Sequence, residues 1–246
     1  MDLPFFYISN YNASQKEIVL DEDTSKHVVQ VLRMKAGEQL NLTDGKGNLL
    51  TCEIANDNNK YCSVSVIVTS YRQPATRKVS IAISLLKNTN RFEWFLEKAI
   101  EIGVSEIIPL ICERTEKEKF RQDRMQGIVI SAMLQSQQVW LPVLHAPFKY
   151  ENIENWKCEN GINFIAHCID GNKQALSNQH IITLSHSLIC IGPEGDFTKD
   201  EIELAQQHGF IPVSLGETRL RTETAGIVAA TLLTINDKPF SNLITN

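Results

Sequence analysis

Short apolar runs separated by turn-forming clusters fill the first seventy or so residues of the chain. Residues 25–34 have the spacing of a helical turn, and partly alternating apolar and polar positions on either side of them indicate strands. These strands are predicted over residues 17–23, 38–44, 48–54 and 61–68. Closely spaced strands joined by glycine- and asparagine-rich turns are typical of a small barrel. The pattern therefore predicts a β-barrel domain over residues 1–72.

A polar segment at residues 72–78 is the predicted linker, and beyond it strands alternate with helices. Residues 79–86 form a continuous apolar run, as expected of a strand covered on both faces. The next helix has an apolar stripe at helical spacing, with Asn90 as its expected cap and Gly103 at its end. Further strands are predicted at residues 106–111, 161–168, 187–192 and 210–216, and helices at 121–138, 198–209 and 222–235. This alternation predicts an α/β domain with a mostly parallel sheet over residues 73–246.

The bulk composition is that of an ordinary globular protein, with 43% hydrophobic and 22% charged residues among 246. The net charge of −5 argues against a protein that coats nucleic acid non-specifically, although it leaves room for a local basic site. No run is long enough for a membrane span, and the N-terminus lacks a secretory leader, so we expect a cytoplasmic protein. The six cysteines and six histidines show no metal-ligand spacing, which predicts free thiols and no metal.

Two predicted strand ends could carry chemistry. The first runs into Gly192, Glu194 and Gly195, and the second runs into Gly216 and a loop with two arginines. Ligands bind outside the carboxyl ends of strands in open α/β sheets, and glycines let a ligand approach the backbone. Each loop alone could be only a tight turn. Because two such loops carry acids or arginines, we favour a binding site, with Glu194 expected to be buried.

The loops do not match known phosphate-binding patterns. Neither a G-x-x-x-x-G-K-[ST] loop nor a G-x-G-x-x-G loop occurs, and Asp196 would repel a phosphate. A neutral or cationic cofactor fits better, and S-adenosylmethionine is one example. No G-x-S-x-G nucleophile motif is present, and His167 is interpreted as a core histidine. The small residues around Gly226 indicate close helix packing, either within the core or between two copies of the chain.

Three long motifs resemble those of the RsmE family, the 16S ribosomal RNA (uracil-N3) methyltransferases. They are "LEKAIEIGVSEIIPLICERT" at residues 96–115, "IGPEGDFTKDEIELAQQHGF" at 191–210 and "VSLGETRLRTETA" at 213–225. Residues 27–54 are similar to the RNA-binding, PUA-like barrel of the same family. The resemblance covers nearly the whole chain in order. It implies a PUA-like domain over 1–72 and a SPOUT methyltransferase domain with a deep trefoil knot over 73–246.

The resemblance also implies an activity. Members of this family transfer a methyl group from S-adenosylmethionine to N3 of a uridine in 16S ribosomal RNA, uridine 1498 by the family's description. They are homodimers, and the expected substrate is the assembled small ribosomal subunit. No membrane and no metal are implied. The alternatives that remain are a non-catalytic ribosome assembly factor of the same fold and a related knotted enzyme acting on transfer RNA or ribose.

The family motifs assign roles to individual residues. Arg221 would stabilise the developing uracil anion, and Glu223 would either take the proton or hold Arg221. The expected cofactor-binding residues are Ile191, Gly192, Glu194, Gly195, Leu215, Gly216, Leu220 and Thr222. The expected RNA-binding residues are His27, Arg33, Lys35, Arg91, Arg114, Lys117 and Arg121. Several of these basic residues lie in the mixed-charge segment 114–124, where interleaved acids are also consistent with a plain solvated surface.

The chain departs from the family pattern in three places. Asp196 stands where glycine is common. Thr218 stands where an arginine is frequent, with Arg219 one place later. Gln138 and Trp140 also replace frequent arginines that would touch RNA. The expectation is therefore that the other basic residues compensate in gripping the substrate.

Overall fold

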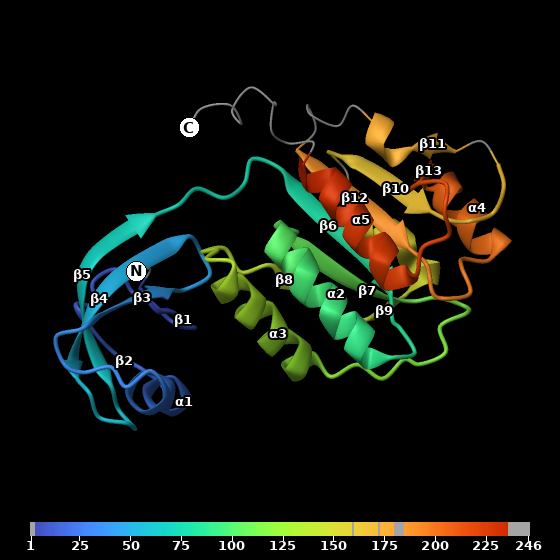
Figure 1. The fold of residues 1–246 in the computed structure, drawn as a ribbon. Coiled ribbons are helices and arrows are strands. Elements are labelled where there is room, and N and C mark those ends of the chain that lie inside the picture. The colour runs from blue at the N-terminus through green and yellow to red at the C-terminus, as the bar shows by residue number, and fades with distance from the viewer. Residues whose placement is uncertain (1–2, 159, 172, 180–184, 236–246) are drawn as a thin grey trace. The chain divides into compact units, whose positions relative to one another are not determined.

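The computed structural model describes residues 3–158, 160–171, 173–179 and 185–235, and Figure 1 shows its elements. The chain forms two compact units. The first contains the described residues of Met1–Pro74 together with Met133–Leu141, and the second contains those of Ala75–Ala132 and Pro142–Asn246. The sequence suggested a single division near residue 72. The structure differs in assigning a short internal segment, Met133–Leu141, to the first unit.

The first unit is built on a five-stranded sheet in the order β1-β3-β4-β5-β2. Its strands are β1 (Phe5–Tyr7), β2 (Glu17–Val19), β3 (Gln39–Thr43), β4 (Asn48–Asn56) and β5 (Ser63–Tyr71). Leu40, Leu42, Leu50 and Ile54 are fully buried or nearly so, because alternate residues of β3 and β4 point into one core. The helical turn is α1 (Glu22–Lys26), followed by one π-helical turn, η1 (His27–Val31). The four predicted strands of this region are present, although the first ends at Val19 because α1 begins at Glu22, and β1 was not predicted.

The segment Met133–Leu141 completes the first unit. The amide of Gly47 donates to the carbonyl of Val139, and the amide of Leu141 donates to the carbonyl of Gly45, at 2.9 Å each. The Trp140 indole donates to the carbonyl of Arg72 at 2.9 Å and meets the Tyr71 ring edge-on. Trp140, at a position where an RNA-binding arginine is frequent, thus has a structural role here.

The second unit contains an eight-stranded sheet in the order β11-β13-β10-β12-β6-β7-β8, with β9 paired to β7. All of its pairings are parallel. The strands are β6 (Lys78–Ser84), β7 (Glu106–Ile111), β8 (Val143–Leu144), β9 (Phe148–Lys149), β10 (Ile162–Ala166), β11 (Gln174–Ala175), β12 (His186–Ile191) and β13 (Ile211–Ser214). The central strands are buried along most of their length, as their continuous apolar runs predict.

Four helices accompany this sheet: α2 (Thr89–Ile102), α3 (Gln122–Gln135), α4 (Lys199–Gln207) and α5 (Thr222–Ile235), with short 3₁₀ turns η2 (Tyr150–Trp156) and η3 (Leu176–Asn178). The predicted cap of α2 at Asn90 is wrong. The Asn88 side chain caps the helix by accepting from the amide of Asn90 at 3.0 Å, because it is the residue with extended backbone. Gly103 ends α2 with φ +103°, and Thr198 and Glu201 form the predicted capping box of α4.

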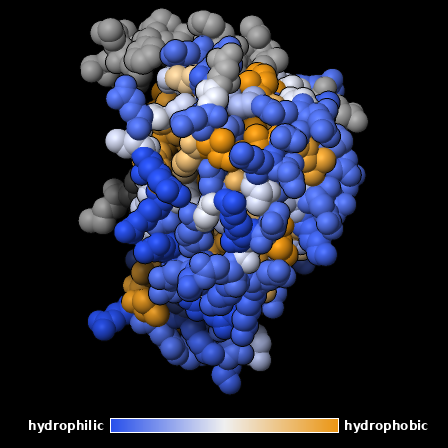
Figure 2. All heavy atoms as spheres, turned by 90° about the vertical axis from the view of Figure 1, so that its right-hand side faces the viewer, coloured by the Kyte–Doolittle hydropathy of each residue, from blue (hydrophilic) through white to orange (hydrophobic). Residues whose placement is uncertain are grey.

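Two features of the topology position the site. β12 lies between β6 and β10, and β13 pairs with the other side of β10. After β13 the chain returns as α5, which packs against α2, β6 and β12 (Figure 1). The carboxyl ends of β10, β12 and β13 therefore meet at one edge of the sheet. On the face shown in Figure 2, hydrophilic residues predominate and apolar residues form separate small groups, as expected when helices and loops cover the strands.

The small residues of α5 serve core packing in this chain. Ala229 and Ala230 are fully buried, and a Cβ added to Gly226 would lie 2.6 Å from Cε2 of Phe95 and 3.0 Å from Cδ1 of Ile83. Both contacts are closer than ordinary packing allows. The absence of a side chain at position 226 is thus what lets α5 approach α2 and β6.

We predict that Gly226→Ala lowers the free energy of unfolding by about 1–3 kcal/mol, because the new methyl group overpacks this contact. The matched control is Gly127→Ala in α3, where a Cβ meets nothing within 4 Å. That change should raise stability by about 0.5–1 kcal/mol through helix propensity alone. Chemical denaturation measures both variants. Equal stabilisation by the two changes would contradict the packing argument.

Candidate functional site

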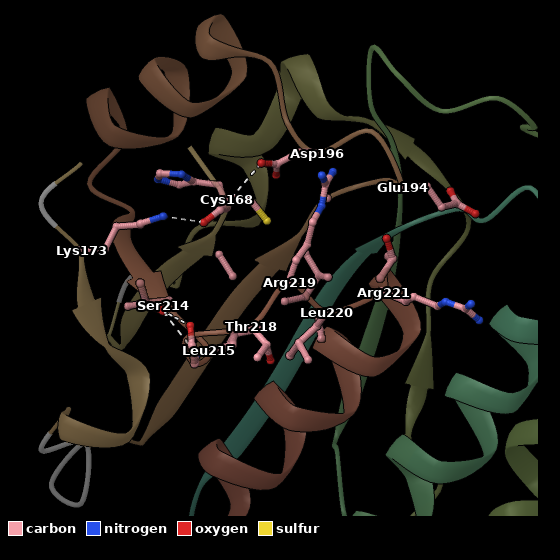
Figure 3. A pocket seen from close by; sticks show the side chains of 18 of the residues that line it. Cys168, Lys173, Glu194, Asp196, Ser214, Leu215, Thr218, Arg219, Leu220 and Arg221 are labelled. Atoms are coloured by element: carbon pink, nitrogen blue, oxygen red, sulfur yellow. Dashed lines mark hydrogen bonds between the residues drawn. The ribbon is translucent and has the colours of Figure 1, made fainter. Parts of the chain in front are cut away.

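A cavity of about 740 Å³ lies at the carboxyl ends of β10, β12 and β13. Three loops line it, one after each strand (Figure 3). Its volume is in the range of small-molecule sites, roughly 300–1,000 Å³. The two loops that the sequence singled out therefore meet, and a third loop joins them.

Most of the expected ligand-binding residues border this cavity. They are Ile191, Gly192, Glu194, Leu215, Gly216, Leu220 and Thr222, together with Arg221. Gly195 and Glu223 were expected to belong with them, but they are not among the lining residues. The arrangement brings the two sequence motifs together as predicted, while Gly195 is exposed outside the lining and Glu223 is buried outside it.

The loop after β12 is shaped by a close contact and held by its neighbours. A Cβ on Gly192 would lie 3.0 Å from the buried ring of Phe197 and 3.1 Å from its amide nitrogen, so glycine fits this position best. Glu194 was expected to be buried, and this prediction is wrong. Its side chain is exposed, and its Oε1 accepts from the amide of Lys87 at 3.3 Å. The acid belongs to the rim of the cavity because a solvated carboxylate has no desolvation cost.

Asp196 occupies a left-handed backbone position with φ +65°, a conformation that glycine adopts most readily. Aspartate is one of the few other residues that tolerate this conformation, because its short side chain can bond locally. Its Oδ1 accepts from the amide of Phe197 at 2.9 Å. Its Oδ2 accepts from the amide of Cys168, in the loop after β10, at 2.8 Å. The replacement is thus accommodated and adds a bond that glycine lacks.

The loop after β13 begins with a tight turn at Gly216, whose φ of +145° is a glycine conformation. The hydroxyl of Ser214 donates to the Gly216 carbonyl at 2.9 Å and accepts from its amide at 3.3 Å. Both arginines of this loop border the cavity. In Figure 3, Arg219 extends toward Asp196, whereas Arg221 extends toward the side on which Glu194 lies. Arg219 had been noted only as a departure from the family pattern.

The third wall, after β10, was missed. It contributes Ala166, His167, Cys168, Asp170 and Lys173 to the cavity lining. The Lys173 ammonium donates to the carbonyls of His167 and Ile169, at 2.9 and 2.8 Å, and braces this loop from within. The missing signal was the strand order, since β10 pairs with both β12 and β13.

His167 was interpreted as a core histidine, and the structure places it half-buried at the cavity wall. Both ring nitrogens are buried and have no hydrogen-bond partner among the described residues. Burial and the nearby Lys173 ammonium lower the pKa of the imidazole. The ring is therefore neutral at physiological pH, with one donor and one acceptor nitrogen.

Glu223 lies in the first turn of α5 and pairs with a residue predicted to bind RNA. Its Oε1 is 3.7 Å from Nε of Arg91, and its buried Oε2 has no partner in the part of the chain that the structure describes. The carboxylate thus joins the start of α5 to the first turn of α2. This arrangement fits a holding role better than a role inside the cavity.

The loop after β7 is pinned to the loop after β12. Glu201 of the α4 capping box accepts from the amide of Glu113 at 2.9 Å, and Nη1 of Arg114 donates to the carbonyl of Gly195 at 2.7 Å. Lys117 and Arg121 follow on the same segment with exposed side chains. Arg114, predicted to bind RNA, therefore also supports the wall of the cavity.

The remaining predicted RNA-binding residues belong to the first unit. His27, Arg33 and Lys35 are exposed in and just after η1. The Lys35 ammonium lies 3.3 Å from the Asp57 carboxylate, an exposed pair of small energetic weight. These three side chains are accessible to a phosphate backbone.

The cavity offers both signs of charge and an apolar surface. Carboxylates come from Asp170, Glu194, Asp196 and Glu217, and cations from Lys173, Arg219 and Arg221. Ile191, Val213 and Leu215 add apolar contacts. Such a lining suits a ligand with positive and negative groups and a flat apolar part. Within the described ranges, no cluster of three His, Cys, Asp or Glu residues could hold a metal, and no helix could cross a membrane.

Comparisons with known proteins agree with this geometry. Residues 73–234 match a family described as the RNA methyltransferase domain, and residues 20–67 match the RNA methyltransferase PUA domain. The ribosomal RNA small subunit methyltransferase E of Buchnera aphidicola subsp. Acyrthosiphon pisum is 30% identical over 241 residues, which cover 94% of this chain and 92% of the relative. The protein of that name from Rickettsia conorii is 29% identical and covers 91% of each chain.

Solved structures are similar over the whole length. The crystal structure of a probable rRNA methyltransferase from Porphyromonas gingivalis has a TM-score of 0.87 and 37% identity, covering 96% of this chain and 98% of that one. A ribosomal RNA small subunit methyltransferase E from Neisseria gonorrhoeae, bound to S-adenosyl methionine, has a TM-score of 0.85 and 26% identity, covering 95% and 97%.

We predict that Gly216→Ala lowers the free energy of unfolding by about 1–2 kcal/mol, because alanine is strained at φ +145°. The matched control is Gly171→Ala in the loop after β10, where φ is not positive and a Cβ meets nothing within 4 Å. Its effect should be neutral or slightly stabilising. Denaturant titrations compare the two, and equal effects would show that the backbone at position 216 is not constrained.

Proposed function

Because this chain belongs to the RsmE family of ribosomal RNA small subunit methyltransferases, we propose that it methylates N3 of a uridine in 16S ribosomal RNA. It is an S-adenosylmethionine-dependent RNA methyltransferase. By the family resemblance the target is uridine 1498, within the assembled small subunit. The single observation that carries the proposal is the cavity, around which the two family motifs meet at three neighbouring strand ends.

The cavity lining fits the cofactor. When bound, S-adenosylmethionine supplies a methyl group activated by a positively charged sulfur. Gly192 and Gly216 leave the backbone open to the ligand, and Leu215 and Leu220 offer apolar contact to its adenine. The carboxylates on the wall favour its positive charge, and the cations favour its carboxylate. The neutral imidazole of His167 is available as a further polar group at the wall.

Methyl transfer would require the N3 proton of uracil to leave, so that the nitrogen lone pair can form a bond to the methyl carbon while the bond from that carbon to sulfur breaks. We assign Arg221, which borders the cavity, to stabilising negative charge on the uracil oxygens. Glu223 is not part of the lining, and its carboxylate faces Arg91, so we assign it to holding the start of α5. The proton then passes to water. Positioning of the two reactants supplies much of the rate.

The proposed RNA contacts lie on both units. His27, Arg33 and Lys35 lie on the PUA-matching part of the chain, and Arg114, Lys117 and Arg121 lie on the segment after β7. A net charge of −5 gives weak non-specific attraction, which favours a shaped particle over bare RNA as the substrate. We also propose a cytoplasmic homodimer. With it we propose a trefoil knot in the C-terminal part, as the family resemblance implies.

We predict that the purified protein transfers labelled methyl groups to unmethylated small ribosomal subunits as 3-methyluridine, detected by mass spectrometry of digested RNA. Arg221→Ala should lower the rate about 100-fold, because one stabilising donor is lost in the transition state. Its affinity for the cofactor should fall much less than the rate, because Lys173 and Arg219 still line the cavity. Lys199→Ala, an exposed change on α4, is the matched control and should keep the wild-type rate.

The outcomes separate the alternatives. Cofactor binding without labelled subunits would redirect the search to other RNAs. Neither label nor cofactor binding would overturn the enzymatic proposal and leave a non-catalytic assembly factor of the same fold.

A second prediction separates RNA contact from support of the cavity. Lys117→Ala and Arg114→Ala should each weaken RNA binding and reduce the slope of log affinity against log salt by about 1, since each removes one phosphate contact. Only Arg114→Ala should also weaken cofactor binding, because its guanidinium holds the Gly195 carbonyl. Filter binding across salt concentrations and calorimetry measure the two effects. An unchanged salt slope for both variants would exclude this segment from the RNA interface.

A further inference from the structure

Asp196 joins two walls of the cavity. β10 and β12 pair up to Ala166 and Ile191, and their loops then diverge. Beyond that pairing, the Asp196 carboxylate reaches across and accepts from the amide of Cys168 at 2.8 Å (Figure 3). Its other oxygen is bonded to the amide of Phe197 at the entry to α4. One side chain thus connects the loop after β12, the loop after β10 and the approach to a helix.

We propose that Asp196 is a positioning residue that fixes the loop after β10 against the loop after β12, and thereby sets the affinity for S-adenosylmethionine. The inference rests on the proposed function for its ligand. It assigns a role to the one residue of this motif that departs from the family's glycine.

The loop after β10 needs such an anchor. Cys168 and Asp170 are exposed, and both face the cavity. Lys173 donates to two carbonyls of the same loop. These bonds fix the shape of the loop but not its position relative to the loop after β12. The bond from Asp196 supplies that place, and a bond from an amide to a carboxylate is about twice as strong as a neutral one.

The backbone explains why the anchor is tolerated. At φ +65° glycine is the least strained residue, and it offers no side chain to bind Cys168. Aspartate accepts some strain and gains two charge-assisted hydrogen bonds. Replacing Asp196 by glycine therefore relieves the backbone while it removes the connection. Because the two effects differ, an experiment can distinguish a change in the stability of the fold from a change in the position of the loop after β10.

The test compares Asp196→Gly with Asp196→Asn, and uses Asp200→Asn as the matched control for loss of one negative charge. Asp200 is exposed in the first turn of α4 and lies outside the cavity lining. Calorimetry with S-adenosylmethionine gives the dissociation constant. Amide hydrogen exchange at Cys168 in the ligand-free protein reads the bond directly, and thermal unfolding reports on the fold.

We expect Asp196→Gly to raise the dissociation constant on the order of tenfold and to speed exchange at Cys168, with little change in thermal stability. Asp196→Asn tolerates the same backbone and keeps one oxygen acceptor, which can bind the Cys168 amide but not the Phe197 amide as well, so it should restore part of the affinity and of the slow exchange. Asp200→Asn should match the wild type in both. If Asp196→Asn binds S-adenosylmethionine more tightly than Asp196→Gly does, the hydrogen bond to Cys168, rather than the negative charge, is the source of the affinity.

Two results would overturn the proposal. One is wild-type affinity in Asp196→Gly, whether or not exchange at Cys168 has changed. The other is weak binding in Asp196→Gly with unchanged exchange at Cys168, since the loss would then not act through this bond. If the wild-type protein itself binds no S-adenosylmethionine, the proposed function fails, and the exchange measurement still tests whether Asp196 holds the loop.

Discussion

The pairing of β12 between β6 and β10 is the constraint on which the cavity depends. Because all pairings in this sheet are parallel, the loops that leave β10, β12 and β13 start from the same edge. These strand pairings thereby bring together loops that are separated by some fifty residues along the chain. After β13 the chain returns as α5, which packs closely against β6 because Gly226 has no side chain. This packing fixes the start of α5 beside the same edge of the sheet.

Side chains that bind backbone groups hold these loops in place. Glu201 accepts from the amide of Glu113 and also belongs to the N-terminal capping box of α4, so one buried carboxylate stabilises the start of a helix and positions a loop. Arg114, which follows Glu113 in the loop after β7, donates to the Gly195 carbonyl. Asp196 accepts from the Cys168 amide in the loop after β10. Such bonds restrain the loops while the cavity-facing backbone stays open to a ligand. The shape of the cavity wall therefore depends on Glu201 and Arg114, which lie outside the lining, as well as on residues such as Asp196 that belong to it.

Much of the fold could be predicted from the sequence, because continuous apolar runs indicate buried strands and the capping box at Thr198 indicates the start of a helix. Both signals depend only on neighbouring residues. The two motif loops could be joined for the same reason, since both follow buried strands. The third wall could not, because nothing local indicates that β10 pairs with both neighbours. The exposure of Glu194 and the capping role of Asn88 depend on where single side chains turn, which composition and spacing do not encode.

The segment Met133–Leu141 has a consequence for how the chain is synthesised. The Gly47 amide and the Gly45 carbonyl find their partners at Val139 and Leu141 only after those residues have been made. During translation all five strands of the N-terminal sheet are therefore made first, and these two hydrogen bonds form only after β6, α2 and β7 have followed. A fragment that ends at residue 72 would lack Val139 and Trp140. The Gly47 amide and the Arg72 carbonyl would then lose these hydrogen-bond partners. The N-terminal unit is therefore compact in the folded protein, although its two segments are synthesised at different times.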